Sequence, residues 1–246
     1  MHPAESIAID EPEFPAQLRS IPSPPKRLWV RGALPPLAAV AIVGTRRPSS
    51  FGRGVARAAA LGAVRAGLAV VSGLAAGIDT VAHESALAAG GLTFAVLGSG
   101  VDVPNPIENR NLVEEIVAAG GGLLAEMPPG TPPNRRQLVA RDRIQSGLSL
   151  AVVICQCEIS SGAMHTARFA VLQGRPLVVA LPRDPARASG PCSGNLALAD
   201  PAGCDPAILS AKGVAAEIVG ARRPVADLVV HDSDELDAFW KRLQGA

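Results

Sequence analysis

The sequence predicts an α/β protein with a doubly wound, mainly parallel sheet. Short, continuous apolar strands alternate with helical segments from Ala38 to Ala180. Strands of this kind are buried on both faces by the helices that connect them. The chain has 246 residues, of which 48% are hydrophobic, and this is enough to build one large core.

Three parts follow from the order of the elements. Residues 1–36 are rich in proline and predict an extended arm with one short helical stretch at Pro15–Arg19. Residues 37–220 hold the alternating elements, and residues 221–246 form a tail with an amphipathic helix at Asp232–Leu243.

The domain is expected to alternate strictly between the two kinds of element. Strands are expected at Ala38–Val43, Ala69–Ser72, Leu92–Leu97, Gly121–Glu126, Leu150–Cys155 and Pro176–Ala180. Helices are expected at Phe51–Ala66, Thr80–Ala89, Asn109–Ala119, Arg135–Gly147 and Met164–Gln173. Residues 183–206 read as a long loop, followed by a short helix at Pro206–Lys212.

Charge and aromatic content limit how this chain can bind nucleic acid. The formal net charge is only +1, although 23 residues are Lys or Arg, so a broad basic face is not expected. Nearly all of these cations are arginines, which suit phosphate contacts of fixed geometry. Aromatic residues make up 3% of the chain and tyrosine is absent, so base stacking can contribute little.

The cysteines and the chain ends give no sign of a metal site or a membrane. Cys155, Cys157, Cys192 and Cys204 lack the paired spacing of a zinc site, and we interpret them as buried thiols. The N-terminus has no basic stretch followed by an apolar one, and no segment is long enough to cross a bilayer. We expect a soluble, cytoplasmic protein without metal or cofactor.

Glycine-rich loops follow several of the expected strands. In a doubly wound sheet, ligands bind beyond the carboxyl ends of the strands, and glycine lets backbone amides approach a phosphate. For each loop taken singly, the glycines can also be explained by a tight turn from strand to helix, without any ligand. The candidate binding residues in these loops are Gly44, Thr45, Arg46, Ser72, Gly73, Gly77, Asp79, Gly98, Gly100, Ser161 and Gly162.

Strict nucleotide fingerprints are missing. Gly-x-Gly-x-x-Gly does not follow the first strand of the alternating series, and no loop ends in Gly-Lys-Ser/Thr. This argues against a dehydrogenase and against an ATPase.

Six blocks occur in the order and spacing of one known family. They are Ile42-Val43-Gly44-Thr45-Arg46 with Ser50-Phe51-Gly52, Val71-Ser72-Gly73-Leu74-Ala75-Ala76-Gly77-Ile78-Asp79, Gly98-Ser99-Gly100-Val101-Asp102 with Pro106 and Asn109, Glu126 with Pro128 and Gly130, Arg141-Asp142-Arg143-Ile144, and Ser161-Gly162-Ala163-Met164-His165-Thr166-Ala167. From about residue 14 to about residue 213, the chain resembles the DNA-processing protein A (DprA/Smf) family.

This resemblance implies both a fold and a function. It implies an extended Rossmann-like domain that binds single-stranded DNA, helps to load a RecA-type recombinase during natural transformation, and commonly forms a homodimer. It implies no enzymatic activity, and it adds Arg141, Arg143 and Thr166 to the candidate phosphate-binding residues.

The chain departs from the family pattern at three places. Asn105-Pro106-Ile107 stands where the family has Tyr-Pro followed by a frequent lysine, and Asp142 replaces the asparagine of Arg-Asn-Arg. The glycine-rich end of the domain is stretched across Cys192–Lys212. Each change weakens the DNA prediction without affecting the fold.

Several of these residues have two interpretations. Arg46 is expected to contact a ligand. Asp79 opens a helix and is expected to cap it, with ligand contact as the alternative. Arg141 and Arg143 are two residues apart and do not share a helix face, so both can bind phosphate only in an extended segment or at a helix start, and pairing with Asp142 is the alternative.

The histidines are weak catalytic candidates. His83 lies in an alanine-rich helix and is expected to be a packing or capping group. His165 occupies a variable position of its motif.

Two other function classes remain open. The first is a nucleotide-hydrolysing enzyme similar to the lysine-decarboxylase-like phosphoribohydrolases, with Asp102 and Glu126 as a possible carboxylate pair. The Gly-Gly-x-Gly-Thr block of those enzymes is absent here. The second is an interaction module that has lost DNA binding and uses the acidic segment Asp232–Asp237.

Overall fold

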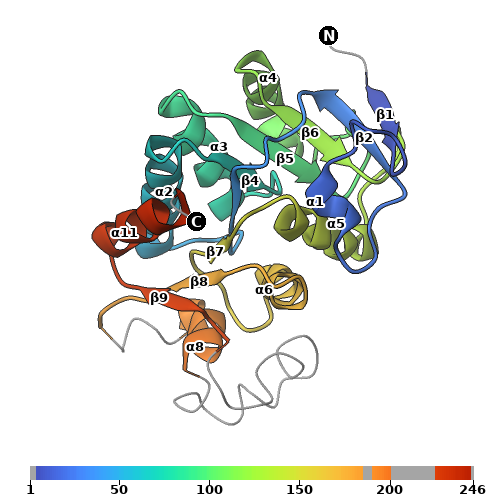
Figure 1. Cartoon of the computed structure of the whole chain (residues 1–246). Helices are drawn as coiled ribbons and strands as arrows, with labels where there is room; N and C mark the ends of the chain where they lie inside the picture. The colour runs from blue at the N-terminus through green and yellow to red at the C-terminus, as the bar shows by residue number, and fades with distance from the viewer. Residues whose placement is uncertain (1–3, 185–189, 201–224, 245–246) are drawn as a thin grey trace.

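A computed structural model describes residues 4–184, 190–200 and 225–244 of the chain. Within them, nine strands form one sheet in the order β1-β2-β6-β5-β4-β3-β7-β8-β9 (Figure 1). The strands are β1 (Glu5–Ala8), β2 (Arg27–Gly32), β3 (Ala39–Val43), β4 (Ala69–Ser72), β5 (Thr93–Leu97), β6 (Gly122–Ala125), β7 (Val152–Ile154), β8 (Leu177–Ala180) and β9 (Leu228–Val230).

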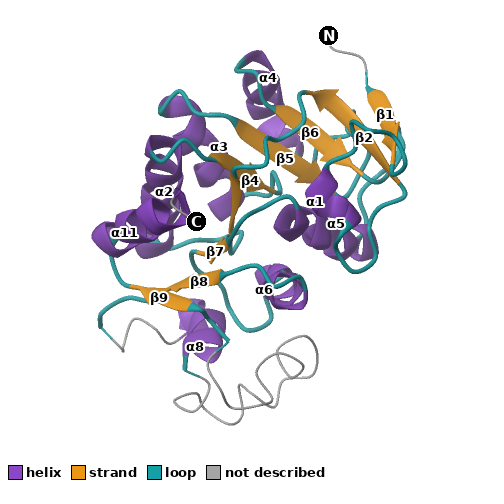
Figure 2. Cartoon of the chain, viewed as in Figure 1, coloured by secondary structure: helices purple, strands orange, loops and turns teal. Residues whose placement is uncertain are grey.

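The helices of the described residues connect these strands and cover the sheet (Figure 2). They are α1 (Ala16–Arg19), α2 (Ser50–Arg65), α3 (Ile78–Ala88), α4 (Arg110–Ala118), α5 (Arg135–Gly147), α6 (Ala163–Leu172), α8 (Ser193–Ala199) and α11 (Ser233–Gln244), with short 3-10 turns at Ile107–Asn109 and Gly190–Cys192.

The sheet is parallel from β6 to β9, and its strand order reverses once. Strands β3 to β6 follow one another outward in one direction, whereas β7, β8 and β9 continue from β3 in the other. Strand β3 pairs with both β4 and β7, and Val43 at its end lies opposite Ile154. The crevice between the loops that leave β3 and β7 is therefore the topological switch point, where doubly wound sheets bind ligands. The predicted fold class is confirmed.

Side chains of each strand alternate between two covered faces. Val40 and Ile42 of β3 pack against α2, α3 and α11, whereas Ala41 and Val43 pack in the cluster that contains α6 and α8. This alternation follows from the two-residue period of a strand. It explains why the strand is an unbroken apolar run.

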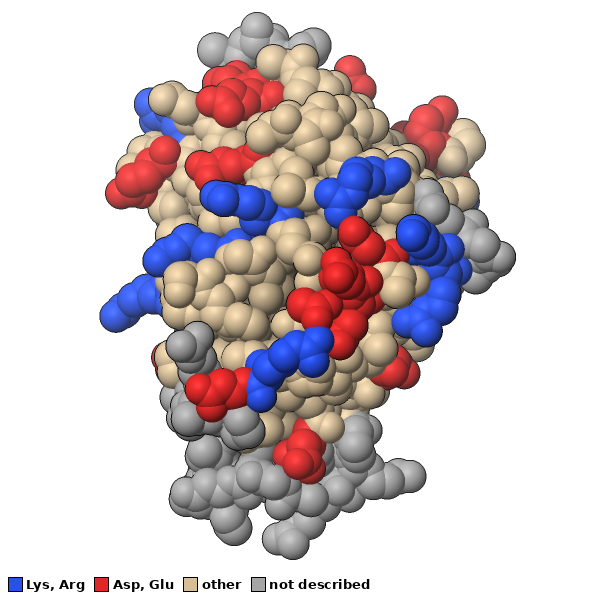
Figure 3. All heavy atoms as spheres, turned by 90° about the vertical axis from the view of Figure 1, so that its left-hand side faces the viewer, with Lys and Arg blue, Asp and Glu red and all other residues tan. Residues whose placement is uncertain are grey.

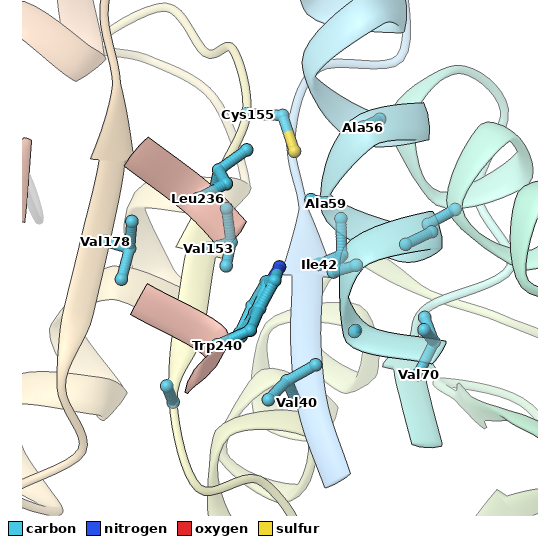
Figure 4. Close-up of a cluster of buried hydrophobic side chains, with 14 of the residues drawn as sticks. Val40, Ile42, Ala56, Ala59, Val70, Val153, Cys155, Val178, Leu236 and Trp240 are labelled. Carbon is cyan, nitrogen blue, oxygen red and sulfur yellow. The ribbon is translucent and has the colours of Figure 1, made fainter. Parts of the chain in front are cut away.

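Helix α2 approaches the sheet closely because its buried face consists of small residues. Ala56, Ala59, Ala60 and Ala63 recur at helical spacing, and none of them is exposed. The gap at the far end of this helix is filled by Trp240 of α11, which lies over β3 beside Ile42 (Figure 4). The tail helix is thus part of the core of the domain.

The structure departs from the sequence prediction at four elements. The N-terminal arm is not only extended: β1 and β2 pair antiparallel with each other, and β2 pairs antiparallel with β6. Strand β9 adds a parallel edge next to β8. Helix α8 forms within residues 183–206, which were expected to be a loop, while the helix expected at Pro206–Lys212 lies outside the described residues.

None of the helices in the described ranges is both long enough and apolar enough to span a membrane.

Candidate functional site

A pocket of about 750 Å³ opens at the switch point of the sheet. Its walls come from four segments: the loop after β3, the start of α3, one face of α5, and the loop from β7 into α6. Of the predicted binding residues, the pocket is lined by Gly44, Thr45, Arg46, Asp79, Arg141, Ser161, Gly162 and Thr166.

The loop after β3 is held between β7 and α3. The Thr45 amide donates to the Gln156 carbonyl at 2.7 Å, and the Thr45 carbonyl accepts from the Ile78 amide at 3.1 Å. Gly44 and Gly77 make this close contact possible. A Cβ on Gly44 would lie 2.7 Å from the Gln156 carbonyl oxygen, and Gly77 has φ +88° with the Thr45 carbonyl directly beneath it.

Arg46 projects from this fixed loop into the pocket. It is exposed and lines the pocket together with Arg47 and Arg135, which are also exposed. Among the described residues, none of these three guanidinium groups makes an ion pair or a side-chain hydrogen bond. Three free cations therefore surround the opening, as an anionic ligand requires.

Asp79 stabilises the loop after β4. Its carboxylate accepts from the amides of Gly73 at 3.1 Å and Ala75 at 3.4 Å. Helix α3 begins at Ile78, one residue before Asp79, and its N-cap residue Gly77 makes no side-chain capping hydrogen bond. The expected capping role is thus replaced by a related one, in which the carboxylate binds loop amides instead of helix amides. Ser72 is buried beneath this loop and donates to the Ile42 carbonyl at 2.7 Å.

Arg141 forms the buried floor of the pocket. Its Nη1 donates to the Val96 carbonyl at 2.5 Å, and its Nε donates to the Asp142 carboxylate at 2.8 Å. The guanidinium lies so close to Gly73 that a Cβ there would overlap it. Arg141 therefore pairs with Asp142, as the alternative interpretation had it, while still lining the pocket.

Asp142 titrates unusually because of this position. It is 6% exposed, and burial raises its pKa to about 7. The guanidinium groups of Arg141 and Arg46 lower the pKa, and the Asp79 carboxylate raises it further. Burial also raises the pKa of Asp79, against the opposing effect of Arg141. The floor of the pocket thus holds one fixed cation between two carboxyl groups that resist ionisation.

The loop from β7 into α6 gives the pocket an open wall. At Gly162, apart from its two chain neighbours, no atom of the described residues lies within 4 Å of where a Cβ would be, so these residues leave the backbone there uncovered. The Ser161 hydroxyl accepts from the Ala163 amide at 3.3 Å, and Thr166 lies buried one turn into the helix. This is a helix N-terminus that faces the pocket, where backbone amides and the helix dipole favour an anion.

Six predicted residues lie outside the pocket lining: Ser72, Gly73, Gly77, Gly98, Gly100 and Arg143. Three of them contact residues behind the pocket wall, as described above: Ser72 contacts Ile42, Gly73 contacts Arg141, and Gly77 contacts Thr45. Gly98 packs against α5, because a Cβ at this position would lie 2.9 Å from the Leu138 backbone. The Gly100 amide donates to the Thr131 carbonyl at 2.9 Å. These two glycines fit turns, which was the alternative interpretation for each loop.

Arg143 points away from the ligand site. Its Nη2 donates to the Glu126 carboxylate at 2.7 Å, and its Nε donates to the Ser23 carbonyl at 2.8 Å. Arg143 lies within the regular helix α5. Two helical residues that are two positions apart do not share a face, so Arg143 points away from the side of Arg141. Arg143 ties the N-terminal arm to the domain.

Sequence reasoning missed several residues of the site. One face of α5 lines the pocket. Its residues recur at helical intervals, with Leu138 and Val139 side by side in the sequence, and they are Arg135, Leu138, Val139, Asp142 and Gln145. Helical periodicity counted from the predicted start of α5 would have found this set. Gln145 is buried, and its Nε2 has no hydrogen-bond partner among the described residues.

The other groups considered for chemistry are committed elsewhere. Asp102 accepts from the Gly130 amide at 2.8 Å, Glu126 pairs with Arg143, and neither lines the pocket. His83 is fully buried, its Nδ1 lies 2.7 Å from the Thr93 hydroxyl, and burial lowers its pKa to about 3. His83 is therefore a neutral packing group, as expected.

The described cysteines behave as expected. Cys155, Cys157 and Cys192 are buried free thiols. Burial raises the pKa of all three. The described ranges contain no group of three or more His, Cys, Asp or Glu side chains that could hold a metal ion.

The sequence comparisons agree on one family. The model of the family described as DNA recombination-mediator protein A matches residues 5–202. The Smf protein of Synechocystis sp. is 43% identical over 185 residues, which cover 73% of this chain and 46% of that protein. The chain spans about half the length of several curated relatives that it matches.

Two solved structures share this fold. DNA processing protein A of Streptococcus pneumoniae aligns with a TM-score of 0.71 and 27% identity over 95% of this chain and 73% of that one. DNA processing protein A of Helicobacter pylori, in a structure that addresses its single-stranded DNA binding mode, aligns with a TM-score of 0.72 and 24% identity over 97% of this chain and 96% of that one.

Proposed function

Because this chain belongs to the DNA recombination-mediator protein A family, we propose that it binds single-stranded DNA in the pocket at the switch point of its sheet. One observation carries the proposal: three exposed, unpaired arginines surround a pocket whose walls include an uncovered helix N-terminus. The single-stranded DNA binding mode addressed for the Helicobacter pylori relative supports the same ligand class.

The chemistry of the pocket suits the backbone of the strand. Arg46 and Arg135 supply charge-assisted hydrogen bonds to phosphate oxygens. The amides near Gly162 supply neutral donors, and none of these groups reads a base edge in a defined way. Because phosphate contacts carry no sequence information, we expect little sequence preference. The single-stranded DNA binding mode addressed for the Helicobacter pylori relative leads us to propose a preference for single strands over duplex.

The test is fluorescence anisotropy with a labelled oligo-dT at low and moderate salt. Arg46→Ala should weaken binding by about tenfold or more, on the scale of a lost hydrogen bond between charged groups. Arg27→Ala is the matched control, because Arg27 is an exposed arginine on the N-terminal arm. Absence of binding at low salt, or an Arg46→Ala variant that binds like its parent, would remove the DNA proposal.

The family description also supports a role in recombination. A recombination mediator delivers a strand to a recombinase, so we propose a RecA-type protein as the partner and DNA uptake as the setting. The measurement is the rate at which a RecA-type recombinase begins to hydrolyse ATP on single-stranded DNA that is coated with a single-strand-binding protein. It is made with and without this chain. A chain that leaves this rate unchanged would contradict the partnership.

We further propose that the active form is a homodimer, with one pocket in each copy. Sedimentation equilibrium in the presence and absence of oligo-dT measures this directly. A monomer under both conditions would contradict it.

The nucleotide-hydrolase alternative now depends on a different residue. Glu126 lies outside the pocket lining, whereas Asp142 is a pocket carboxyl that titrates near neutral pH, a property of general acids and bases. Incubation with AMP and detection of released base tests this alternative. Turnover that disappears in Asp142→Asn would establish an enzyme.

A further inference from the structure

Two more unpaired arginines extend from the pocket along helix α2. Arg53 and Arg57 are four residues apart, so they lie on the same side of the helix. Both are exposed, and neither makes an ion pair or a side-chain hydrogen bond with any described residue. We call the surface formed by Arg53, Gly54 and Arg57 the α2 ridge.

The α2 ridge is continuous with the pocket. Arg46 and Arg47 line the pocket, and Ser49, two residues further on, caps α2 by accepting from the Gly52 amide. The Ser49 amide donates at 2.9 Å to the side-chain Oε1 of Gln156, and the main-chain carbonyl of the same residue accepts from the Thr45 amide in the loop after β3. The start of the helix is therefore fixed relative to the pocket wall, and Arg53 follows one turn beyond the cap.

Counting the ion pairs of the described residues, α2 carries unpaired charge only in the part nearer the pocket. At the far end, Arg65 donates to both carboxylate oxygens of Asp237 in α11 at 2.8 and 2.9 Å. The surrounding face of the molecule mixes basic and acidic side chains (Figure 3). Within α2, the positive charge that is available to a polyanion is therefore confined to the part nearer the pocket.

Gly54 gives a second, independent indication. It lies inside the helix between the two arginines, where glycine destabilises a helix relative to alanine. Packing against the described residues does not explain it, because none of them outside the helix's own backbone places an atom within 4 Å of the virtual Cβ of Gly54. Bare helix backbone between two free arginines is a surface that a ligand backbone can approach closely.

The spacing of the arginines suits a nucleic-acid strand. Four residues of α-helix advance about 6 Å, and a stacked strand advances about 3.4 Å per nucleotide. Two flexible guanidinium groups at this separation reach phosphates of nearby nucleotides on one strand.

Resting on the proposed function, we propose that the α2 ridge is a second contact surface for the backbone of single-stranded DNA, which it guides away from the pocket. A short strand fills the pocket alone. A longer strand also contacts Arg53 and Arg57, so its binding releases additional counterions.

Two oligo-dT lengths separate the ridge from the pocket. Anisotropy is measured over a range of salt concentrations with strands of about four and about sixteen nucleotides. For the longer strand, Arg53→Ala/Arg57→Ala should weaken binding by about fivefold or more. It should also reduce the slope of log affinity against log salt by about 1.4, that is, about 0.7 for each lost phosphate contact. Binding of the shorter strand should stay within about twofold of the parent.

Two control variants complete the experiment. Lys26→Ala/Arg27→Ala removes the same charge from the N-terminal arm and should leave the salt slope for the longer strand unchanged. Arg53→Lys/Arg57→Lys keeps the charge and should keep the slope.

The possible failures point to different claims. If the double alanine variant matches its parent on the longer strand, or weakens both strands equally, the α2 ridge is not a separate contact surface. If the parent binds neither strand at low salt, the proposed function fails, and the ridge proposal fails with it.

Discussion

At the scale of a single residue, Asp142 is the group that should make ligand binding in the pocket depend on pH. A phosphate bound beside Asp142 disfavours its ionised form, so ligand binding and protonation of this carboxyl should be coupled. Because its pKa is raised to about 7, DNA affinity should fall as the pH rises from about 6 to about 8. Asp142→Asn should remove most of this dependence and bind more tightly at pH 8, as oligo-dT titrations at several pH values would show. A parent whose affinity is constant across this range would contradict the coupling.

The same carboxyl affects stability in a defined direction. Its pKa is higher in the folded than in the unfolded chain, so protonation stabilises the fold, and this stability is lost as the pH rises from about 4 to about 7. The free energy of unfolding of the parent should fall relative to Asp142→Asn by up to about 1.4 kcal/mol per pH unit in this range. Urea denaturation at several pH values measures it. Parallel pH curves for the two proteins would show that Asp142 titrates normally.

Gly73 and Gly54 form a matched pair of glycine substitutions. Gly73→Ala places a methyl group against the Arg141 guanidinium and should destabilise the fold by about 1–3 kcal/mol. Gly54→Ala adds the same methyl group to an open helix surface and should stabilise it by about 0.5–1 kcal/mol. Thermal unfolding measures both, and a Gly73→Ala variant as stable as Gly54→Ala would refute the described packing of Arg141.

At the scale of elements, α11 should hold the domain together. Trp240 is buried, and its ring lies against Gly62 of α2, so close that a Cβ on Gly62 would overlap it. Trp240→Ala should lower the free energy of unfolding by about 3–5 kcal/mol. Lys241→Ala changes the exposed neighbour and should have little effect. Equal unfolding midpoints for the two variants would show that the tail helix is dispensable.

Most central elements could be predicted from the sequence because their signals are local. Strands β3 to β8 are short apolar runs, and α2 to α6 carry helical periodicity between glycine-rich turns. In β2, Leu28 and Val30 also show the two-residue period of a strand. The prolines around them favour an extended arm without sheet pairing, so the sequence does not predict this strand.

The missed elements depend on tertiary partners. Strand β9 is three residues long and is ordered by pairing with β8. Helix α8 lies in a glycine-rich segment, where it is held by Asn195. The side chain of Asn195 accepts from the Cys157 amide at 2.6 Å and donates to the Ala180 carbonyl at 2.8 Å. No pattern within the segment itself encodes such contacts.

The candidate site was predictable to a similar extent. Gly44, Arg46 and Gly162 were found because glycine-rich loops at strand ends converge in this fold. Arg143 did not reach the pocket, because the orientation of a helical side chain depends on how the helix is docked. The sequence does not show that Arg47 and Arg135 lack ion pairs with the other described residues, because ion pairing depends on which side chains the fold brings together.

At the scale of the whole molecule, the number of unpaired arginines on the proposed strand path, and not the net charge of +1, sets the expected salt dependence. Arg46, Arg47, Arg53, Arg57 and Arg135 are five unpaired cations on the proposed strand path, and about 0.7 for each predicts a slope of about −3.5 for a long oligo-dT. Anisotropy over a range of salt concentrations measures this slope. A slope near zero would mean that phosphate contacts do not drive binding.

Amide hydrogen exchange with and without oligo-dT tests the central claim, which is that single-stranded DNA occupies the pocket at the switch point. Binding should slow exchange in the loop Gly44–Arg47 and in the segment from Ser161 into α6, while β1 and β2 remain unchanged. Strand binding that leaves both pocket loops unprotected, or that protects only the N-terminal arm, would contradict the account.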